Sequence, residues 1–253
     1  MIKNENNIKL RDHRSYKIVK ANDLIQKSRF NLQLQEQKII LYLISKIKPE
    51  DVELKEHLFE IQDFCKICGL DSCNGANYIY IKKTLKDLRD KSIWITLDDG
   101  SETVLAWLDT VTINKDSGIV KLKIAEMMKP YLLLLREHYT QYELLYTLAM
   151  KSQYSIRLYE LLKSYEYQRT RTFDIDELKL RLSAEKYKRF ADFKRYVLDR
   201  AINEINSLSD LDVTYDIIKK NRKFIKIEFT MTIIKDITTR VKTWAKIEKI
   251  IGD

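Results

Sequence analysis

The side chains best suited to chemistry in this sequence are basic ones, gathered in its C-terminal half. Lys188 and Arg189 precede a segment of helical periodicity, and Lys194, Arg195 and Tyr196 lie within it. A guanidinium can bond two acceptors of guanine at once, and a lysine or arginine can neutralise a phosphate. This segment therefore indicates contact with a polyanion, and Arg195 is the first candidate for reading a base.

Helical spacing separates these candidates from a buried side. Four apolar residues define the side expected to pack inward: Phe193, Val197, Ala201 and Ile205. Four others point away from it: Asp192, Arg195, Tyr196 and Asp199. Lys194 falls toward the apolar side and is a lesser candidate, because its long stem still lets the ammonium reach water. A simpler explanation is that these charges solvate an exposed face, but a neighbouring basic turn favours binding.

That turn joins two strands in which apolar and polar residues alternate, residues 211–217 and 225–231. Its basic residues are Lys219, Lys220, Arg222 and Lys223. Helix, strand, basic turn and strand is the layout of a winged helix, whose helix enters the major groove. The turn then suits phosphate or minor-groove contacts, which depend on salt and little on sequence. A solvated turn is the alternative, and Asn221 alone would suit one.

The first half carries a weaker version of the same pattern. Lys82, Lys83 and Lys86 lie off the apolar stripe of a helix predicted over residues 77–90, with Tyr80 nearby. The hairpin turn that follows, residues 98–100, is Asp-Asp-Gly. Its acidic character departs from a basic wing and argues against a DNA contact by this hairpin.

Both halves repeat one order of elements, without any repeat at the level of residues. The first half predicts helices over 35–48, 62–68 and 77–90 and strands over 58–61, 92–97, 103–112 and 119–124. The second predicts a long helix over 144–167, a strand over 171–173, a short helix capped by Asp174 or Asp176 and a helix over 191–206. The two alternating strands and their basic turn follow this last helix.

The expected fold is therefore α+β, with two tandem winged-helix domains related by pseudo-symmetry. The expected division is an N-terminal extension over 1–20, a first winged helix over 21–135, a second over 136–235 and a C-terminal tail over 236–253. The second domain would carry the main DNA recognition, and the first a further DNA contact and possible dimerisation. The tail itself has the pattern of a short amphipathic helix.

Composition agrees with an anionic partner. Lysine and arginine number 46 against 37 acidic residues, and the net charge is +9. With only 5 glycines and 2 prolines, no flexible linker separates the halves. We expect a cytoplasmic protein without membrane contact, since the first 20 residues are polar and no apolar run reaches transmembrane length.

The residue types that most often carry catalysis or bind metals do not cluster in the sequence. Cys65, Cys68, Cys73 and His57 fit no zinc spacing, and the cysteines read better as small buried apolar residues. The other histidines, His13 and His138, are far from His57 in sequence, and no glycine-rich loop precedes a Lys-Ser or Lys-Thr pair. We therefore expect no catalysis, no metal and no cofactor.

Five segments carry a resemblance to a known family. They are residues 21–25 (ANDLI), 36–41 (EQKIIL), 86–91 (KDLRDK), 155–162 (SIRLYELL) and 193–206 (FKRYVLDRAINEIN). In this order they resemble the iteron-binding Rep family of plasmid replication initiators, over about residues 22–231. The resemblance implies two winged-helix domains and binding at origin repeats called iterons. It further implies recruitment of host helicase and DnaA-type initiator, with monomers that initiate and dimers that repress their own promoter.

The sequence thus predicts a double-stranded DNA-binding initiator of plasmid replication. A two-domain transcriptional repressor would use the same binding chemistry for a different purpose. An adaptor whose winged helices bind proteins is a third possibility, and its affinity for DNA would be nil.

Overall fold

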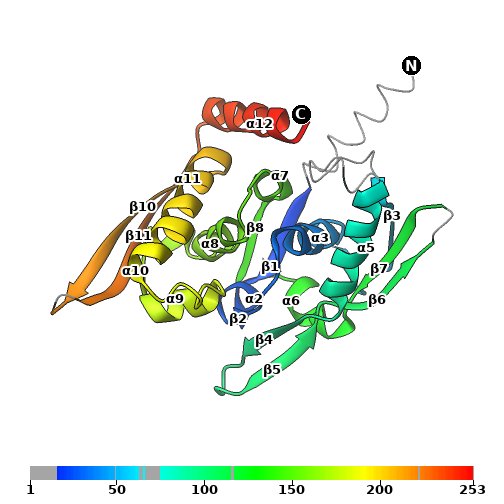
Figure 1. The fold of residues 1–253 in the computed structure, drawn as a ribbon, viewed down its shortest axis with the longest axis horizontal. Coiled ribbons are helices and arrows are strands. Elements are labelled where there is room, and N and C mark those ends of the chain that lie inside the picture. The colour runs from blue at the N-terminus through cyan, green and yellow to red at the C-terminus, as the bar shows by residue number, and fades with distance from the viewer. Residues whose placement is uncertain are drawn as a thin grey trace.

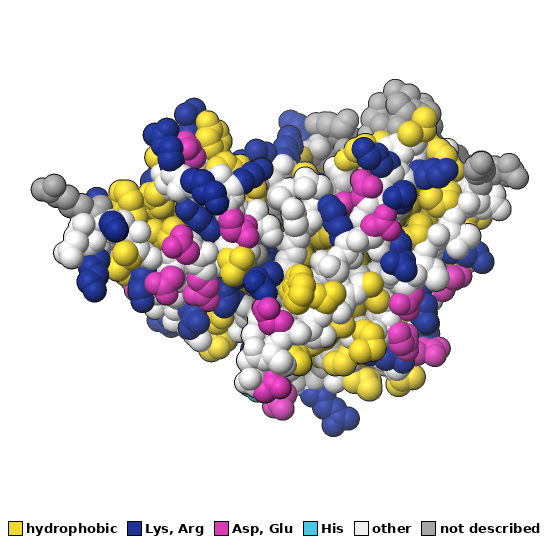
Figure 2. Space-filling model, turned by 60° about the horizontal axis from the view of Figure 1, so that its bottom comes forward, with side chains coloured by type: hydrophobic (Ala, Val, Ile, Leu, Met, Phe, Trp, Pro, Cys, Tyr) yellow, Lys and Arg dark blue, Asp and Glu magenta, His cyan; other side chains and the backbone are white. Residues whose placement is uncertain are grey.

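The computed structural model describes residues 16–48, 50–62, 65, 75–114, 117–221 and 223–252. It contains two winged-helix domains that lie side by side, with α3 and α8 between them (Figure 1). On the face drawn in Figure 2, Lys and Arg side chains alternate with Asp and Glu and are not collected in one block. No helix within the described ranges is long and apolar enough to cross a membrane.

The first domain contains the elements from β1 to α6. Its helices are α2 (Asn22–Gln26), α3 (Leu34–Ile44), α5 (Gly75–Arg89) and α6 (Lys129–Leu132), with a 3₁₀ turn η1 (Glu126–Met128). Its strands are β1 (Lys17–Ala21), β2 (Ser28–Arg29), β3 (His57–Glu60), β4 (Ser92–Thr96), β5 (Glu102–Ala106), β6 (Leu108–Ile113) and β7 (Ile119–Ile124). The short helix expected over 62–68 lies mostly outside the described residues.

The second domain contains the elements from β8 to β11, and one helix follows it. Its helices are α7 (Leu144–Leu148), α8 (Gln153–Lys163), α9 (Ile175–Arg181), α10 (Phe190–Phe193) and α11 (Asp199–Leu208). The shorter turns are η2 (Glu166–Gln168) and the π-helical turn η3 (Lys194–Leu198). Its strands are β8 (Tyr139–Glu143), β9 (Thr170–Asp174), β10 (Leu211–Lys220) and β11 (Lys223–Ile233), and the last helix is α12 (Ile237–Gly252).

The expected pseudo-symmetry is confirmed by the order of strands. In the second domain the sheet runs β9-β11-β10, so the short strand that follows α8 pairs with the last strand of the domain. In the first domain the sheet runs β3-β7-β6, and the short strand after α3 again pairs with the last strand. The hairpin β6–β7 is therefore the counterpart of β10–β11.

This correspondence corrects the strand expected over 103–112. The segment forms two strands, β5 and β6, that belong to different sheets. Trp107 lies between them and is buried, and its side chain packs edge-on against Phe30 with ring centroids 5.0 Å apart. Burial of this large ring marks the junction between the β4–β5 hairpin and the β6–β7 hairpin, which corresponds to the wing β10–β11 of the second domain.

The single helix expected over 144–167 is also wrong, because α7 and α8 are separate. Ser152 has an extended backbone, and its Oγ accepts a hydrogen bond from the N–H of Tyr154 at 3.2 Å, which caps α8. The neighbouring Lys151 donates its N–H to Glu204 (3.0 Å), and its carbonyl accepts from Arg200 (3.0 Å). The interruption is stabilised by partners from α11, which lie about fifty positions away in the sequence.

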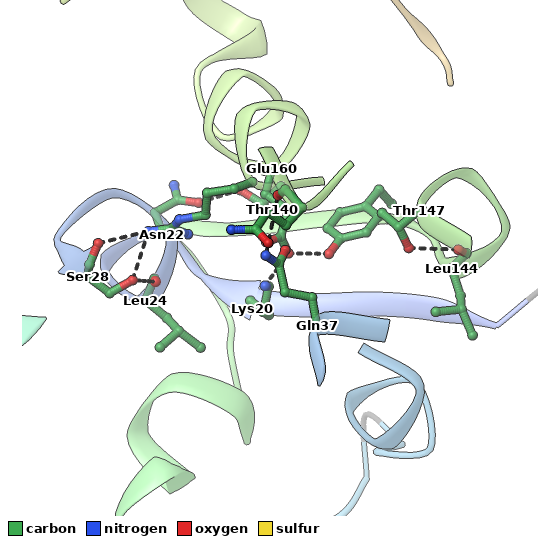
Figure 3. A network of polar contacts seen from close by, with 12 residues as sticks. Lys20, Asn22, Leu24, Ser28, Gln37, Thr140, Leu144, Thr147 and Glu160 are labelled. Carbon is green, nitrogen blue, oxygen red and sulfur yellow. Dashed lines mark hydrogen bonds and ion pairs between the residues drawn. The ribbon is translucent and has the colours of Figure 1, made fainter. Parts of the chain in front are cut away.

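The first described strand joins the domains. β1 pairs antiparallel with β8, from Lys17 opposite Glu143 to Ala21 opposite Tyr139. The segment expected to be an extension therefore includes most of this strand. Lys20 on β1 is only 4% exposed and forms an ion pair with Glu160 on α8, which is 2% exposed. The hydroxyl of Tyr142 on β8 also donates to Glu160, so strands β1 and β8 and helix α8 meet at one carboxylate (Figure 3).

A second buried charge ties α8 to the first domain. The guanidinium of Arg157 donates to the carbonyl (2.8 Å) and hydroxyl (3.0 Å) oxygens of Ser28 and lies 4.4 Å over the ring of Phe30. Burial lowers the pKa of Arg157 to about 10, an effect opposed by the charge of Glu160. Arg157 therefore stays charged at neutral pH, and both of these buried charges of α8 make contacts between domains.

The C-terminal segment forms the expected helix, α12, and it is docked on the second domain. Ile247 and Ile251 are buried, and Nε1 of Trp244 donates to the hydroxyl of Tyr146 on α7 (3.2 Å). Arg240 pairs with Glu143 on β8 (2.9 Å). One face of this helix thus extends the core of the second domain.

We expect that Glu160→Gln lowers the free energy of unfolding by about 3–5 kcal/mol, because it leaves the ammonium of Lys20 buried without a countercharge. The double variant Lys20→Met, Glu160→Leu should be less destabilised than the single one, since it removes both charges. Urea unfolding at neutral pH measures both changes.

The matched control is Asp90→Asn, which breaks the exposed pair of Lys86 and Asp90, with side chains 75% and 59% exposed. Exposed pairs contribute little, so its unfolding midpoint should equal that of the wild type. Equal midpoints for Glu160→Gln and this control would contradict the role assigned to the buried pair.

Candidate nucleic-acid interface

The helix that carries the basic candidates runs without a break through α10, η3 and α11. Its predicted buried side is confirmed, because Phe193, Val197, Ala201 and Ile205 have no exposed surface. Arg195 is exposed on the opposite side, and Tyr196 beside it is 49% exposed. The tyrosine ring stacks on Tyr187 with centroids 6.1 Å apart, and the guanidinium of Arg195 lies 5.3 Å from its centroid. Arg195 and Tyr196 therefore both face solvent, and the stacking on Tyr187 restricts how their side chains can move.

Lys188 and Arg189 lie in the segment that leads into α10, and both are exposed. Arg189 occupies the N-cap position with an extended backbone and lies 3.9 Å from the carboxylate of Asp192. This distance is at the outer limit of an ion pair, and the arginine side chain is 81% exposed. Both cations are accessible to an approaching polyanion.

Lys194 differs from these residues because it is engaged within the protein. Its Nζ lies 2.9 and 2.8 Å from the two carboxylate oxygens of Asp199, and the hydroxyl of Tyr215 donates to the same carboxylate at 2.5 Å. The hydrogen bond to Asp199 and then that to Tyr215 raise the pKa of Lys194. Partial burial opposes ionisation of Asp199, yet the bonds from Lys194 and Tyr215 lower its pKa overall. Both groups are thus charged at neutral pH.

The predicted wing is the hairpin of β10 and β11, which projects from the second domain (Figure 1). Lys219, Lys220 and Lys223 are exposed at its end, and Lys220 lies opposite Lys223 in the register. Asn221 has a φ of 47°, a left-handed conformation that asparagine tolerates, so its expected role in the turn is confirmed. Arg222 lies outside the described residues. Among the described residues, three lysines therefore lie together at this hairpin end.

An aromatic contact couples this wing to the candidate recognition helix, which runs through α10, η3 and α11, and no pattern in the sequence indicates this contact. Phe224 at the start of β11 stacks on Phe190 at the start of α10, with ring centroids 4.4 Å apart and planes inclined by 24°. The Nζ of Lys219 lies 4.8 Å from the centroid of the same Phe224 ring. The wing and the helix N-terminus thus form one continuous surface.

In the first domain, α5 presents Lys82, Lys83 and Lys86 to solvent. Ile81, Leu85 and Leu88 form its buried stripe, and Tyr80 is 50% exposed beside the lysines. Lys86 pairs with Asp90 at 2.9 Å, and this hydrogen bond raises the pKa of Lys86. Figure 1 places α5 and α11 on opposite sides of the central α3 and α8, one in each domain.

The acidic turn of β4–β5 is explained by local structure. Asp98 pairs with Lys27 at 2.5 Å, and a carboxylate oxygen of Asp99 accepts from the N–H and hydroxyl of Ser101. Gly100 has a φ of +83°, which the hairpin turn requires. The wing of this domain is instead β6–β7, whose strand β7 carries Lys121 and Lys123. The sequence predicted the strand over 119–124 that becomes β7, but it assigned the wing position to the acidic hairpin and not to β6–β7.

No metal centre emerges from the described part of the chain. There, no group of three or more His, Cys, Asp or Glu side chains is arranged to hold an ion. Cys65 is buried, as expected of a small apolar residue, and Cys68 and Cys73 lie outside the described residues. On the face seen in Figure 2 the cations are interspersed with acids.

Comparisons with known proteins agree with this arrangement. The chain is 28% identical over 148 residues to the PI protein of Escherichia coli, which is 51% of this chain and 48% of that protein. It therefore spans about half the length of this curated relative. The solved structure of the Pi initiator protein in complex with iteron DNA is 25% identical and aligns with a TM-score of 0.70, over 88% of this chain and 99% of that one.

A further solved structure, domains 2 and 3 of RctB, is 11% identical, with a TM-score of 0.47 over 81% of this chain and 85% of that one, a likeness too weak to support any assignment. Two family descriptions match the chain in order. "Initiator Replication protein, WH1" matches residues 17–163, and "Initiator Rep protein, WH2" matches residues 174–231. With both winged helices matched, the chain belongs to the initiator replication protein family.

Proposed function

We propose that this protein binds repeated sites in double-stranded DNA at a plasmid origin and thereby initiates plasmid replication, without catalysis of its own. The observation that carries the proposal is the exposed pair of Arg195 and Tyr196 on a helix whose opposite side is wholly buried. A helix of this kind can lie in the major groove, where base edges differ in donors and acceptors. Arg195 would read a guanine there.

The other candidates have a different task in this proposal. Lys188, Arg189, Lys219, Lys220 and Lys223 would bind phosphates on either side of the recognition helix, and Arg222 is proposed as a further wing contact. Such contacts fix orientation and carry no sequence information directly. Lys82, Lys83 and Lys86 on α5 would serve the first domain, over 21–135, in the same way, while the second, over 136–235, carries the main recognition.

The similarity to the Pi complex supports a joint role for both domains. That alignment extends over 88% of this chain, so it includes both winged helices in one superposition. The Pi protein in that structure is bound to iteron DNA. By analogy we propose that this chain places its two domains on one duplex site.

Two further parts of the proposal rest on family membership. We propose that the bound protein recruits host helicase and a DnaA-type initiator, and that a dimer represses its own promoter through the same DNA contacts. A chain that only repressed transcription would share the DNA chemistry, so replication must be tested separately.

We expect Arg195→Ala to weaken binding to a preferred duplex by roughly tenfold or more, because a bidentate contact to guanine contributes about 1–3 kcal/mol of discrimination. Binding to a scrambled duplex should change much less. The preferred duplex is obtained by selection from a randomised pool, and affinities are measured by fluorescence anisotropy at several salt concentrations.

The contrasting variant is Lys220→Ala, Lys223→Ala. It should weaken binding to both duplexes alike and reduce the slope of log affinity against log salt by about one for each phosphate that the variant no longer neutralises. Equal weakening on the two duplexes for Arg195→Ala would reduce that residue to a backbone contact.

A replication assay separates an initiator from a repressor. A DNA circle that carries only this gene, its flanking DNA and a resistance marker should replicate in a permissive host, and Arg195→Ala should abolish colony formation. Repression of a reporter without any replication would contradict the initiator role while leaving DNA binding intact.

A further inference from the structure

The recognition helix contains a π-helical turn at the position of its base-reading candidates. Residues Lys194–Leu198 form this turn between α10 and α11. Such turns are rare in α-helices and recur at functional sites. Because the turn accommodates one extra residue, the part of the helix before it is rotated by about 100° relative to an uninterrupted helix. Arg195 and Tyr196 lie within this turn, so the directions of their side chains relative to α11 depend on whether the π-helical turn is kept.

A set of polar contacts spans this turn from end to end. Lys194, its first residue, pairs with Asp199, the residue immediately after it, at 2.8 Å. In a regular helix, residues three or four apart are neighbours and residues five apart are not, so this pair requires the wider turn. Tyr215 on β10 donates its hydroxyl to the same carboxylate at 2.5 Å and anchors it to the sheet.

We propose that Asp199 is a positioning residue for sequence recognition, which holds the π-helical turn by accepting hydrogen bonds from Lys194 and Tyr215 and so sets the direction in which Arg195 and Tyr196 meet the bases. This inference rests on the proposed function. It also reassigns Lys194, whose charge is neutralised by Asp199 of the same helix and which therefore does not bind a phosphate.

Simple electrostatics gives the opposite expectation for Asp199. An acidic residue on a DNA-binding face repels phosphates, so its neutralisation should strengthen binding to every duplex. A positioning role instead makes neutralisation harmful to the preferred duplex alone. The sign of the change therefore distinguishes the two roles.

The decisive variant is Asp199→Asn, and the chain offers a matched control in Asp192→Asn. Both acids lie on the same helix, with side chains 40% and 41% exposed. Asp192 has only the 3.9 Å contact with Arg189 among its ion pairs in the described residues, whereas Asp199 bridges the turn to the sheet. Both changes remove one negative charge at a similarly exposed position. Only Asp199→Asn also disrupts the contacts that link the π-helical turn to β10.

We expect Asp199→Asn to weaken binding to the preferred duplex by roughly tenfold, with unchanged or slightly tighter binding to a scrambled duplex. Asp192→Asn should leave the ratio of the two affinities as in the wild type. Tyr215→Phe keeps all charges and removes only the anchoring hydroxyl, so it should lower the ratio in the same direction. Lys194→Met should leave the salt slope unchanged, because this lysine neutralises no phosphate.

Tighter binding of Asp199→Asn to both duplexes, with the ratio preserved as in Asp192→Asn, would overturn the inference. So would an unchanged ratio in Tyr215→Phe, which remains informative if Asp199→Asn does not fold. A wild-type protein without preference for any selected duplex would overturn the proposed function itself, and this result is distinct from the other two.

Discussion

The ion pair between Lys20 and Glu160 constrains how the two domains meet, because it joins them where neither charge reaches water. Charges in such a place are tolerated only when they are paired and further hydrogen-bonded, and Tyr142 supplies the additional bond to Glu160. Arg157, one turn away on α8, donates to Ser28 of the first domain. The pairing of β1 with β8 brings these groups together, so the relative orientation of the domains is fixed by directional contacts and not by apolar packing alone.

The same helix, α8, also determines where the recognition helix lies. Two residues of α11 stabilise the break between α7 and α8. Glu204 accepts from the backbone N–H of Lys151, and Arg200 donates to its carbonyl oxygen. Tyr159 on α8 donates to Asp210 just after α11, at 2.8 Å. A chain of contacts therefore leads from the first domain through α8 to both ends of α11. The two basic helices, α5 and α11, are held at a defined separation, as the proposed recognition of one site by both domains would require.

Periodicity predicted the elements whose structure is decided locally. The stripe from Phe193 to Ile205 and the alternation in β10 and β11 each follow from one buried face. The gap between α7 and α8 was missed because both flanks are apolar and the capping Ser152 resembles any polar residue within a helix. The π-helical turn was invisible for a related reason. Its stabilising partner, Tyr215, comes from another element, so the cause lies in tertiary structure. The wing lysines were predictable as a cluster, but their coupling to the helix through Phe224 was not.

The central claim is that two winged helices, fixed relative to each other, read one duplex site. Hydroxyl-radical footprinting of the preferred duplex with the full chain tests it most directly. We expect two protected segments on one face of the DNA, with centres about one helical turn, or roughly 10–10.5 base pairs, apart. A single protected segment, unchanged when Lys82, Lys83 and Lys86 are replaced by alanine, would contradict the claim.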